Sequence, residues 1–161
     1  MAIEIGAPRP SRTNPPQRIL VVEDDISIRQ LSAEMLMGSG YEVDTAEDGA
    51  AGWEALQARH YDLLITDNSM PKVTGFQMVR MLRGQDPTLP VIMATGAMPT
   101  EEMGRHPGLE INAILLKPYG IADLLETVKK VLSAPAGARA PIAPPPNRPS
   151  PPSADGSRPA P

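Results

Sequence analysis

The chain has 161 residues, 21% of them charged, with no cysteine and a formal net charge of −4. A length of this order predicts one domain, and the lack of cysteine excludes a disulfide scaffold and thiol chemistry. No apolar run approaches the roughly 18 residues of a membrane span, and the N-terminus has no signal-peptide pattern, so we expect a soluble, cytoplasmic protein that is not membrane-bound.

Proline divides the chain into three parts. Ten of the 20 prolines lie in the last 28 residues, and four more lie in the first 17. The tail has one large apolar side chain, Ile142, which cannot offset the entropy cost of ordering it. We therefore expect a disordered N-terminal segment (1–17), one domain (18–133) and a disordered Pro-rich tail (134–161). A basic, Pro-rich tail can also be a peptide ligand, although a solvated tail is the simpler interpretation.

The central part of the chain is acidic. Residues 18–133 hold 10 Lys or Arg and 17 Asp or Glu, a formal charge of −7. This balance argues against nucleic-acid binding through a basic face, and it suits a divalent-cation site.

Short apolar runs alternate with longer amphipathic segments through this central part. The short runs predict five strands, at residues 19–22, 42–46, 63–67, 90–95 and 113–116. Helical spacing is clearest in the last segment, with apolar side chains at Ile121, Leu124, Leu125, Val128 and Leu132. The fourth helix is poorly specified, because only residues 100–106 look helical before Pro107 ends them. The pattern predicts a doubly wound α/β fold, a five-stranded parallel sheet with helices on both faces.

Polar residues follow four of the five predicted strands. These are Glu23-Asp24-Asp25, Asp67, Thr95 and Lys117. Ligands of a doubly wound sheet gather beyond the carboxyl ends of its strands, so we expect these side chains to form a site. Helix capping is the alternative, and it is a reasonable one for Asp25, which precedes the first helical run.

The residue types that follow the strands predict phosphoryl chemistry. Asp24 and Asp67 would repel each other without a hard cation, and Mg²⁺ prefers such oxygen ligands. A carboxylate beside Mg²⁺ and Lys117 can attack phosphorus to give an aspartyl phosphate.

Four blocks of sequence resemble the receiver domain of two-component response regulators. They are ILVVEDD at 19–25, LITDNSMPKVTG at 64–75, VIMATG at 91–96 and LLKPY at 115–119. The resemblance implies the flavodoxin-like, CheY-like strand order 2-1-3-4-5. It also implies roles for single residues. Asp67 is the phosphoacceptor, Thr95 the switch hydroxyl and Lys117 the partner of the phosphoryl group. Mg²⁺ is held by Asp24, Asp67 and the backbone carbonyl of Ser69, with Glu23 assisting through water. A cis bond at Lys117–Pro118 is also implied.

The sequence departs from the family at three places, one of which is the weak fourth helix described above. Family members usually carry an aromatic residue on the last strand, two or three positions before the Lys, where this chain has Ile114 and Leu115. Thr74 stands where an Asp often precedes Gly75.

These features favour a single-domain response regulator rather than an enzyme. It would accept a phosphoryl group from a histidine kinase or a histidine phosphotransfer protein, and act as a switch or phosphorelay carrier on an unknown downstream protein. Because only the Pro-rich tail follows residue 133, we expect no DNA-binding domain. The alternative is a phosphorylation-independent interaction module with a receiver-like fold, which the missing aromatic residue and the weak fourth helix favour.

Overall fold

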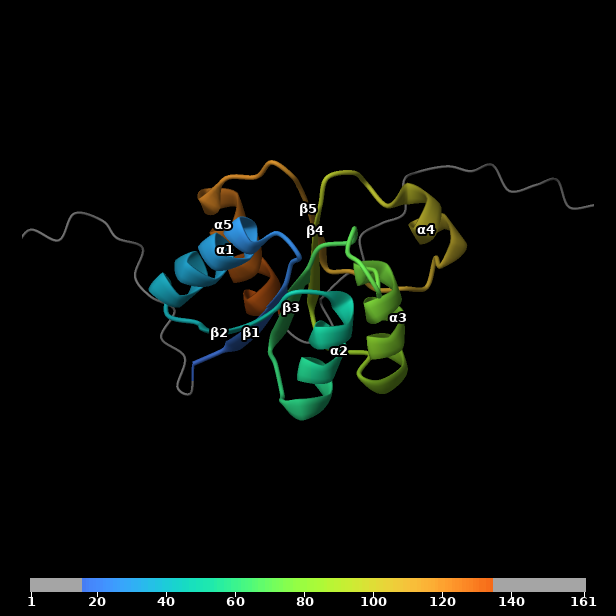
Figure 1. Cartoon of the computed structure of the whole chain (residues 1–161), viewed down its shortest axis with the longest axis horizontal. Coiled ribbons are helices and arrows are strands. Elements are labelled where there is room, and N and C mark those ends of the chain that lie inside the picture. The colour runs from blue at the N-terminus through green and yellow to red at the C-terminus, as the bar shows by residue number, and fades with distance from the viewer. Residues whose placement is uncertain (1–15, 135–161) are drawn as a thin grey trace, which may run out of the picture.

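Five strands and five helices alternate along residues 16–134, the part of the chain that this computed structural model describes (Figure 1). The strands are β1 (Arg18–Val22), β2 (Glu42–Ala46), β3 (Leu63–Thr66), β4 (Val91–Thr95) and β5 (Ala113–Leu116). The helices are α1 (Ile26–Gly38), α2 (Gly49–Ala58), α3 (Gly75–Gln85), α4 (Thr100–Arg105) and α5 (Ile121–Ser133). The segments predicted to be disordered, 1–17 and 134–161, lie outside the described residues except for 16, 17 and 134.

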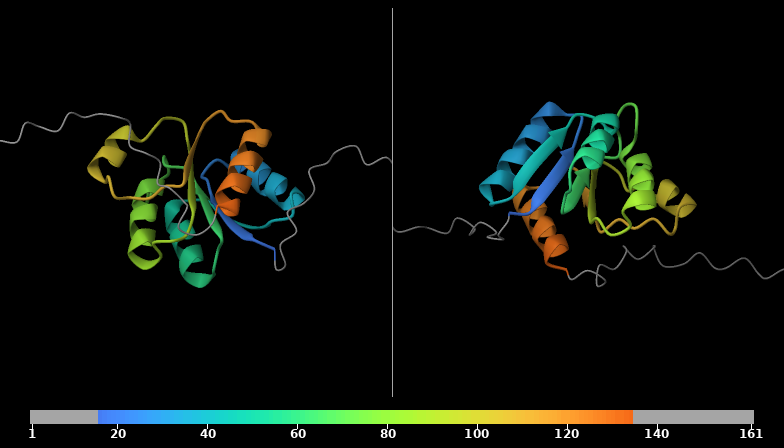
Figure 2. Two further views of the ribbon diagram at one scale, coloured as in Figure 1. Left: turned by 180° about the vertical axis from the view of Figure 1, so that it is seen from behind. Right: turned by 90° about the horizontal axis from the view of Figure 1, so that it is seen from below.

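The strands form one parallel sheet in the order β2-β1-β3-β4-β5. Helices α1 and α5 cover one face, and α2, α3 and α4 lie on the other (Figures 1 and 2). This confirms the predicted fold class, strand order and double winding. No helix within residues 16–134 has the length and apolar character needed to cross a membrane.

Alternate residues of the strands point to opposite faces of the sheet and contribute to two apolar layers, one on each face. Every residue of β3 and β4 is buried, because helices cover both faces there. On the α1 and α5 face the layer includes Ile19, Val21, Leu63, Ile65, Ile92, Leu124 and Val128. On the opposite face it includes Leu20, Val22, Leu64, Phe76, Val79, Val91 and Met93. Each Å² of apolar area buried in these layers contributes about 25 cal/mol to stability. The two layers therefore stabilise the sheet and fix the position of its rim, the edge at which the carboxyl ends of the strands lie.

The helices differ in how firmly their first turns are held. Asp25, Asp48 and Thr74 cap α1, α2 and α3 by accepting backbone N–H groups, and Thr74 forms a capping box with Gln77. Helix α4 has six residues, no side-chain cap and no buried residue. It ends one residue before the predicted limit of 106, and its weak sequence pattern corresponds to weak anchoring.

Candidate functional site

Backbone hydrogen bonds of the sheet continue one residue past three strands and place the side chains of the rim. The amide of Glu23 donates to a carbonyl of β2 at 3.1 Å, and the amide of Asp67 donates to a carbonyl of β1 at 3.0 Å. The amide of Lys117 donates to the carbonyl of Thr95, the last residue of β4, at 2.8 Å. Because β3 ends at Thr66 rather than at the predicted 67, Asp67 is the first residue beyond its strand.

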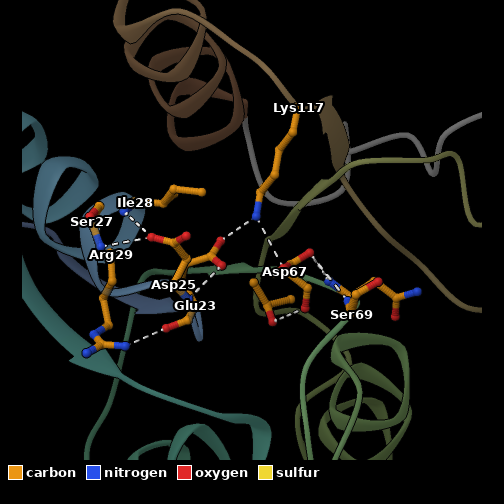
Figure 3. A network of polar contacts seen from close by, with 10 residues as sticks. Glu23, Asp25, Ser27, Ile28, Arg29, Asp67, Ser69 and Lys117 are labelled. Carbon is orange, nitrogen blue, oxygen red and sulfur yellow. Dashed lines mark hydrogen bonds and ion pairs between the residues drawn. The ribbon is translucent and has the colours of Figure 1, made fainter.

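Lys117 joins two buried carboxylates. Its Nζ donates to Glu23 Oε2 at 2.7 Å and to Asp67 Oδ2 at 3.2 Å. Figure 3 shows the Lys117 side chain reaching between the two acidic groups. Hydrogen bonds between ionised partners are about twice as strong as neutral ones, so the ammonium holds both carboxylates in place.

Three carboxylates converge at this point. One ligand oxygen from each of Glu23, Asp24 and Asp67 lies within 4.8 Å of the others. Glu23 and Asp67 are only 4% and 6% exposed, whereas Asp24 is exposed. An all-oxygen, acidic donor set open on one side fits Mg²⁺, which keeps waters and substrate oxygens in its shell. The residues present therefore fit the predicted metal.

The pKa values of Glu23 and Lys117 are both raised, for different reasons. Burial raises the pKa of Glu23, and the hydrogen bond from Lys117 only partly opposes that shift. For Lys117, burial alone would lower the pKa, but the contacts with Glu23 and Asp67 outweigh it and raise the pKa. Lys117 is therefore charged at neutral pH, and its positive charge stabilises the acidic rim.

The second carboxylate oxygen of Asp67 faces the loop that follows it. Oδ1 accepts the amide of Asn68 at 2.7 Å and, more weakly, the amide of Ser69 at 3.4 Å. The Ser69 side chain is exposed, and metal ligation by its carbonyl stays a prediction. Thr95 is 3% exposed at the end of β4, beside β3 in the sheet, and its role as a switch hydroxyl also stays a prediction.

Several contacts of the site were not predicted from the sequence. The amide of Asp25 donates to Glu23 Oε1 at 3.2 Å, and Arg29 donates to the Glu23 carbonyl at 2.8 Å (Figure 3). Asp25 itself accepts the amides of the first turn of α1, which confirms the capping role considered for it. Arg29 lies one turn into α1, and no sequence motif marks it.

Two of the departures from the family pattern have visible consequences, in β5 and at the start of α3. Leu115 is buried and Ile114 half-buried on β5, so aliphatic side chains occupy the positions where an aromatic residue was expected. Thr74 caps α3, a role that an Asp performs equally well. The Lys117–Pro118 bond is cis, as predicted.

The doubly wound α/β fold, with an acidic cluster and a lysine at the carboxyl ends of its strands, is the arrangement that the resemblance to receiver domains implies, and comparison with known proteins agrees. The family model of the response regulator receiver domain matches residues 19–129. The chain belongs to this family.

Two curated relatives and one solved structure illustrate the match. The chain is 37% identical over 117 residues to the probable transcriptional regulatory protein SilR of Salmonella typhimurium, covering 71% of this chain and 50% of SilR. It is 31% identical over 118 residues to the response regulator receiver protein CpdR of Brucella abortus, covering 73% of this chain and 98% of CpdR. The response regulator TrrA of Thermotoga maritima, solved in complex with Mg(2+)-BeF, superposes with a TM-score of 0.64 at 31% identity, covering 71% of this chain and 98% of TrrA. The chain thus spans about half the length of SilR and nearly all of CpdR.

Proposed function

We propose that this protein is a single-domain response regulator that takes a phosphoryl group onto Asp67 in a Mg²⁺-dependent reaction. The donor is a histidine kinase or a histidine phosphotransfer protein, and the product acts as a switch or as a carrier in a phosphorelay in the cytoplasm. The observation that carries the proposal is the contact of the Lys117 ammonium with buried Asp67, at 3.2 Å, inside a cluster of three carboxylates.

In the proposed reaction, an oxygen of Asp67 attacks the phosphorus and the bond from phosphorus to the donor's histidine nitrogen breaks. The nitrogen keeps the bonding electrons, so no oxidant or reductant is needed. We assign Oδ2 as the nucleophile, because it lies beside Lys117 while Oδ1 is held by the backbone amide of Asn68. The ammonium then neutralises charge on the transferring group's oxygens.

Glu23, Asp24 and Asp67, with the carbonyl of Ser69, would hold the metal. Bound Mg²⁺ supplies a positive charge that stabilises the phosphoryl oxygens and allows the carboxylates to remain close. Lys117 and Thr95 donate hydrogen bonds to the remaining oxygens in this proposal. Support for the metal comes from the donor set and from the Mg(2+)-BeF complex of the related TrrA.

The test is labelling by acetyl phosphate, read as a mass increase of one phosphoryl group on the intact protein. Asp67→Asn should remain folded and unlabelled, and EDTA should abolish labelling of the native protein. The matched control is Asp62→Asn, which makes the same chemical change at the opposite end of β3, where Asp62 accepts the amide of Arg18 at 2.8 Å. Full labelling of Asp67→Asn, or labelling at an unchanged rate without metal, would refute the proposal.

Single-domain organisation is part of the proposal, and the near-complete coverage of CpdR supports it. It predicts that an antibody against the domain detects a protein of about 17.2 kDa in the source cells. A substantially larger band would show that the domain belongs to a longer regulator, as the half-length match to SilR allows.

A second candidate function is a phosphorylation-independent interaction module. The aliphatic pair Ile114 and Leu115 on β5 favours it, since the aromatic residue that usually accompanies switching is missing. The two functions differ in how a captured partner responds to a beryllofluoride mimic of the phosphoryl group. Partner binding that is the same with the mimic, without it and in Asp67→Asn favours the module, and binding that changes with the mimic favours the switch.

A further inference from the structure

We propose that Glu102 on α4 is a positioning residue for the phosphorylation site, acting through Asn68, and that phosphorylation of Asp67 and the Asn68–Glu102 hydrogen bond oppose each other. This inference rests on the proposed function, because it requires Asp67 to be the acceptor. It assigns a role to Asn68 and Glu102, neither of which was given one from the sequence, and it connects the site to the most weakly anchored helix of the domain.

Asn68 is tied to the site on one side. It follows Asp67 directly, and its amide donates to Asp67 Oδ1 at 2.7 Å. Its side-chain Oδ1 accepts the amide of Phe76 in the first turn of α3 at 3.0 Å, and its carbonyl accepts the amide of Gly75 at 3.1 Å. These contacts fix the plane of the Asn68 carboxamide, so the direction of its Nδ2 is fixed as well.

The other side of the carboxamide reaches α4. Asn68 Nδ2 donates to Glu102 Oε2 at 3.1 Å, across 34 residues of sequence. Both side chains are half-buried, so water competes only partly for this bond. Among the side-chain hydrogen bonds of residues 16–134, this is the one that joins α4 to the loop carrying the acceptor.

Helix α4 has few other attachments. It lacks a side-chain cap and a buried residue, and its partly buried Met103 packs on the edge of the apolar layer. The ring of His106, just past its end, lies 5.9 Å from that of Phe76. A six-residue helix held in this way has a small free energy of local opening, so one hydrogen bond is a substantial part of what holds it.

Phosphorylation changes the charge next to this bond. A phosphoryl group carries about −1.5 to −2 charges, and it would replace the single charge of the Asp67 carboxylate one residue away from Asn68. Glu102 is itself a carboxylate, so the added charge repels it and weakens its hydrogen bond with Asn68. The coupling is reciprocal in free energy. If phosphorylation of Asp67 weakens the Asn68–Glu102 hydrogen bond, then removing that hydrogen bond favours phosphorylation by the same amount.

The experiment compares Glu102→Ala with the matched control Glu101→Ala in the full chain. Both changes remove one negative charge from the first turn of α4, so both weaken its interaction with the helix dipole equally. Glu101 instead pairs with Arg105 of the same helix, at 2.6 Å, and is exposed. Beryllofluoride is titrated in the presence of Mg²⁺, and hydrogen exchange of amides 100–106 is followed in parallel.

Glu102→Ala should bind beryllofluoride about threefold to tenfold more tightly than the native protein, the equilibrium equivalent of one hydrogen bond. Its α4 amides should exchange without the mimic as fast as those of the mimic-bound native protein. Glu101→Ala should change the titration midpoint by less than about twofold. If the native protein responds to beryllofluoride and Glu102→Ala has the same midpoint and exchange as Glu101→Ala, the role of Glu102 is refuted and the phosphoacceptor function stands. If the native protein does not bind the mimic at all, the proposed function fails, and the inference fails with it.

Discussion

The replacement of Gly75 by alanine tests whether the start of α3 sets the position of Asp67, the proposed phosphoacceptor. A Cβ built on Gly75 would lie 2.0 Å from the carbonyl oxygen of Asp67 and 3.0 Å from the Cα of Asn68. Contacts below 3.0 Å essentially never occur for a real Cβ, and the obstructing atoms are backbone atoms that cannot rotate away. The loop that carries Asp67, or the start of α3, must therefore move by at least about 1 Å to lengthen the 2.0 Å contact to 3.0 Å.

This displacement has a cost in stability and a cost in rate. Overpacking of a tight site typically costs 1–3 kcal/mol, which for a domain of this size lowers Tm by about 4–12 °C. A misplacement of about 1 Å at a reacting group can slow the reaction about 100-fold. We expect Gly75→Ala to show both effects, with the loss of phosphorylation rate measured well below its Tm so that the mutant is folded.

The control is Gly84→Ala, at the other end of the same helix. A Cβ at Gly84 would meet no atom within 4 Å, so this change should be neutral or stabilise the domain by up to about 1 kcal/mol through helix propensity. Thermal unfolding and the rate of labelling by acetyl phosphate are measured for both variants. A Gly75→Ala protein as stable and as reactive as Gly84→Ala would show that the loop adapts without cost, and the steric explanation would be wrong.

Three further predictions concern stability. Arg83 donates to backbone carbonyls of the loops on either side of β4, at 2.6–3.4 Å. Arg83→Lys should therefore lower the free energy of unfolding in denaturant by about 1–3 kcal/mol, and Arg80→Lys, at an exposed position, should lower it by less than about 0.5 kcal/mol. Equal effects of the two changes would contradict this prediction. Burial and a hydrogen bond to a carboxylate raise the pKa of Tyr61 to about 12. Its protonated phenol therefore stabilises the native state fully below about pH 10, and this contribution is lost as the pH rises from about 10 to about 12. Stability should fall less steeply across that range in Tyr61→Phe, and an unchanged slope would exclude this contribution. Removal of residues 1–15 and 135–161 should change Tm by less than about 5 °C, because their composition offers little apolar surface to bury; a larger fall would show that an end packs on the domain.

The rim of the site could be predicted because it depends on the order of polar and apolar residues alone. Once the short apolar runs are identified as parallel strands, the residues that follow them must meet at one edge of the sheet. Glu23, Asp67 and Lys117 therefore came together as expected, and the structure adds only their distances. The capping role of Asp25 could be predicted for a similar reason, since capping is a local interaction.

The contacts of α4 could not be predicted in this way. Residues 96–112 contain no clear periodicity, and Gly96, Gly104, Pro107 and Gly108 interrupt any helical pattern. The direction in which this segment leaves β4 decides which side chain meets Asn68, and loop geometry of this kind has no sequence signature. The steric need for Gly75 was hidden for a related reason, because it arises from a carbonyl group eight residues earlier in the chain.

The charge of the rim connects the proposed reaction with the proposed role of Glu102. Counted formally, three carboxylates and one ammonium give the cluster a charge of −2, which a divalent cation would neutralise. Phosphorylation of Asp67 would replace one carboxylate charge with about two. With both the divalent cation and the phosphoryl group bound, the site would carry a net charge near −1. That net charge lies in a partly buried place, where charges are screened less than at the surface. The domain can lower this energy by moving a negative group away, and Glu102 is the carboxylate that is hydrogen-bonded to the acceptor loop while lying on a helix with little else to hold it. The proposed phosphorylation of Asp67 would therefore act on α4 through Glu102, in a chain whose β5 carries aliphatic residues at the positions where family members usually carry an aromatic residue.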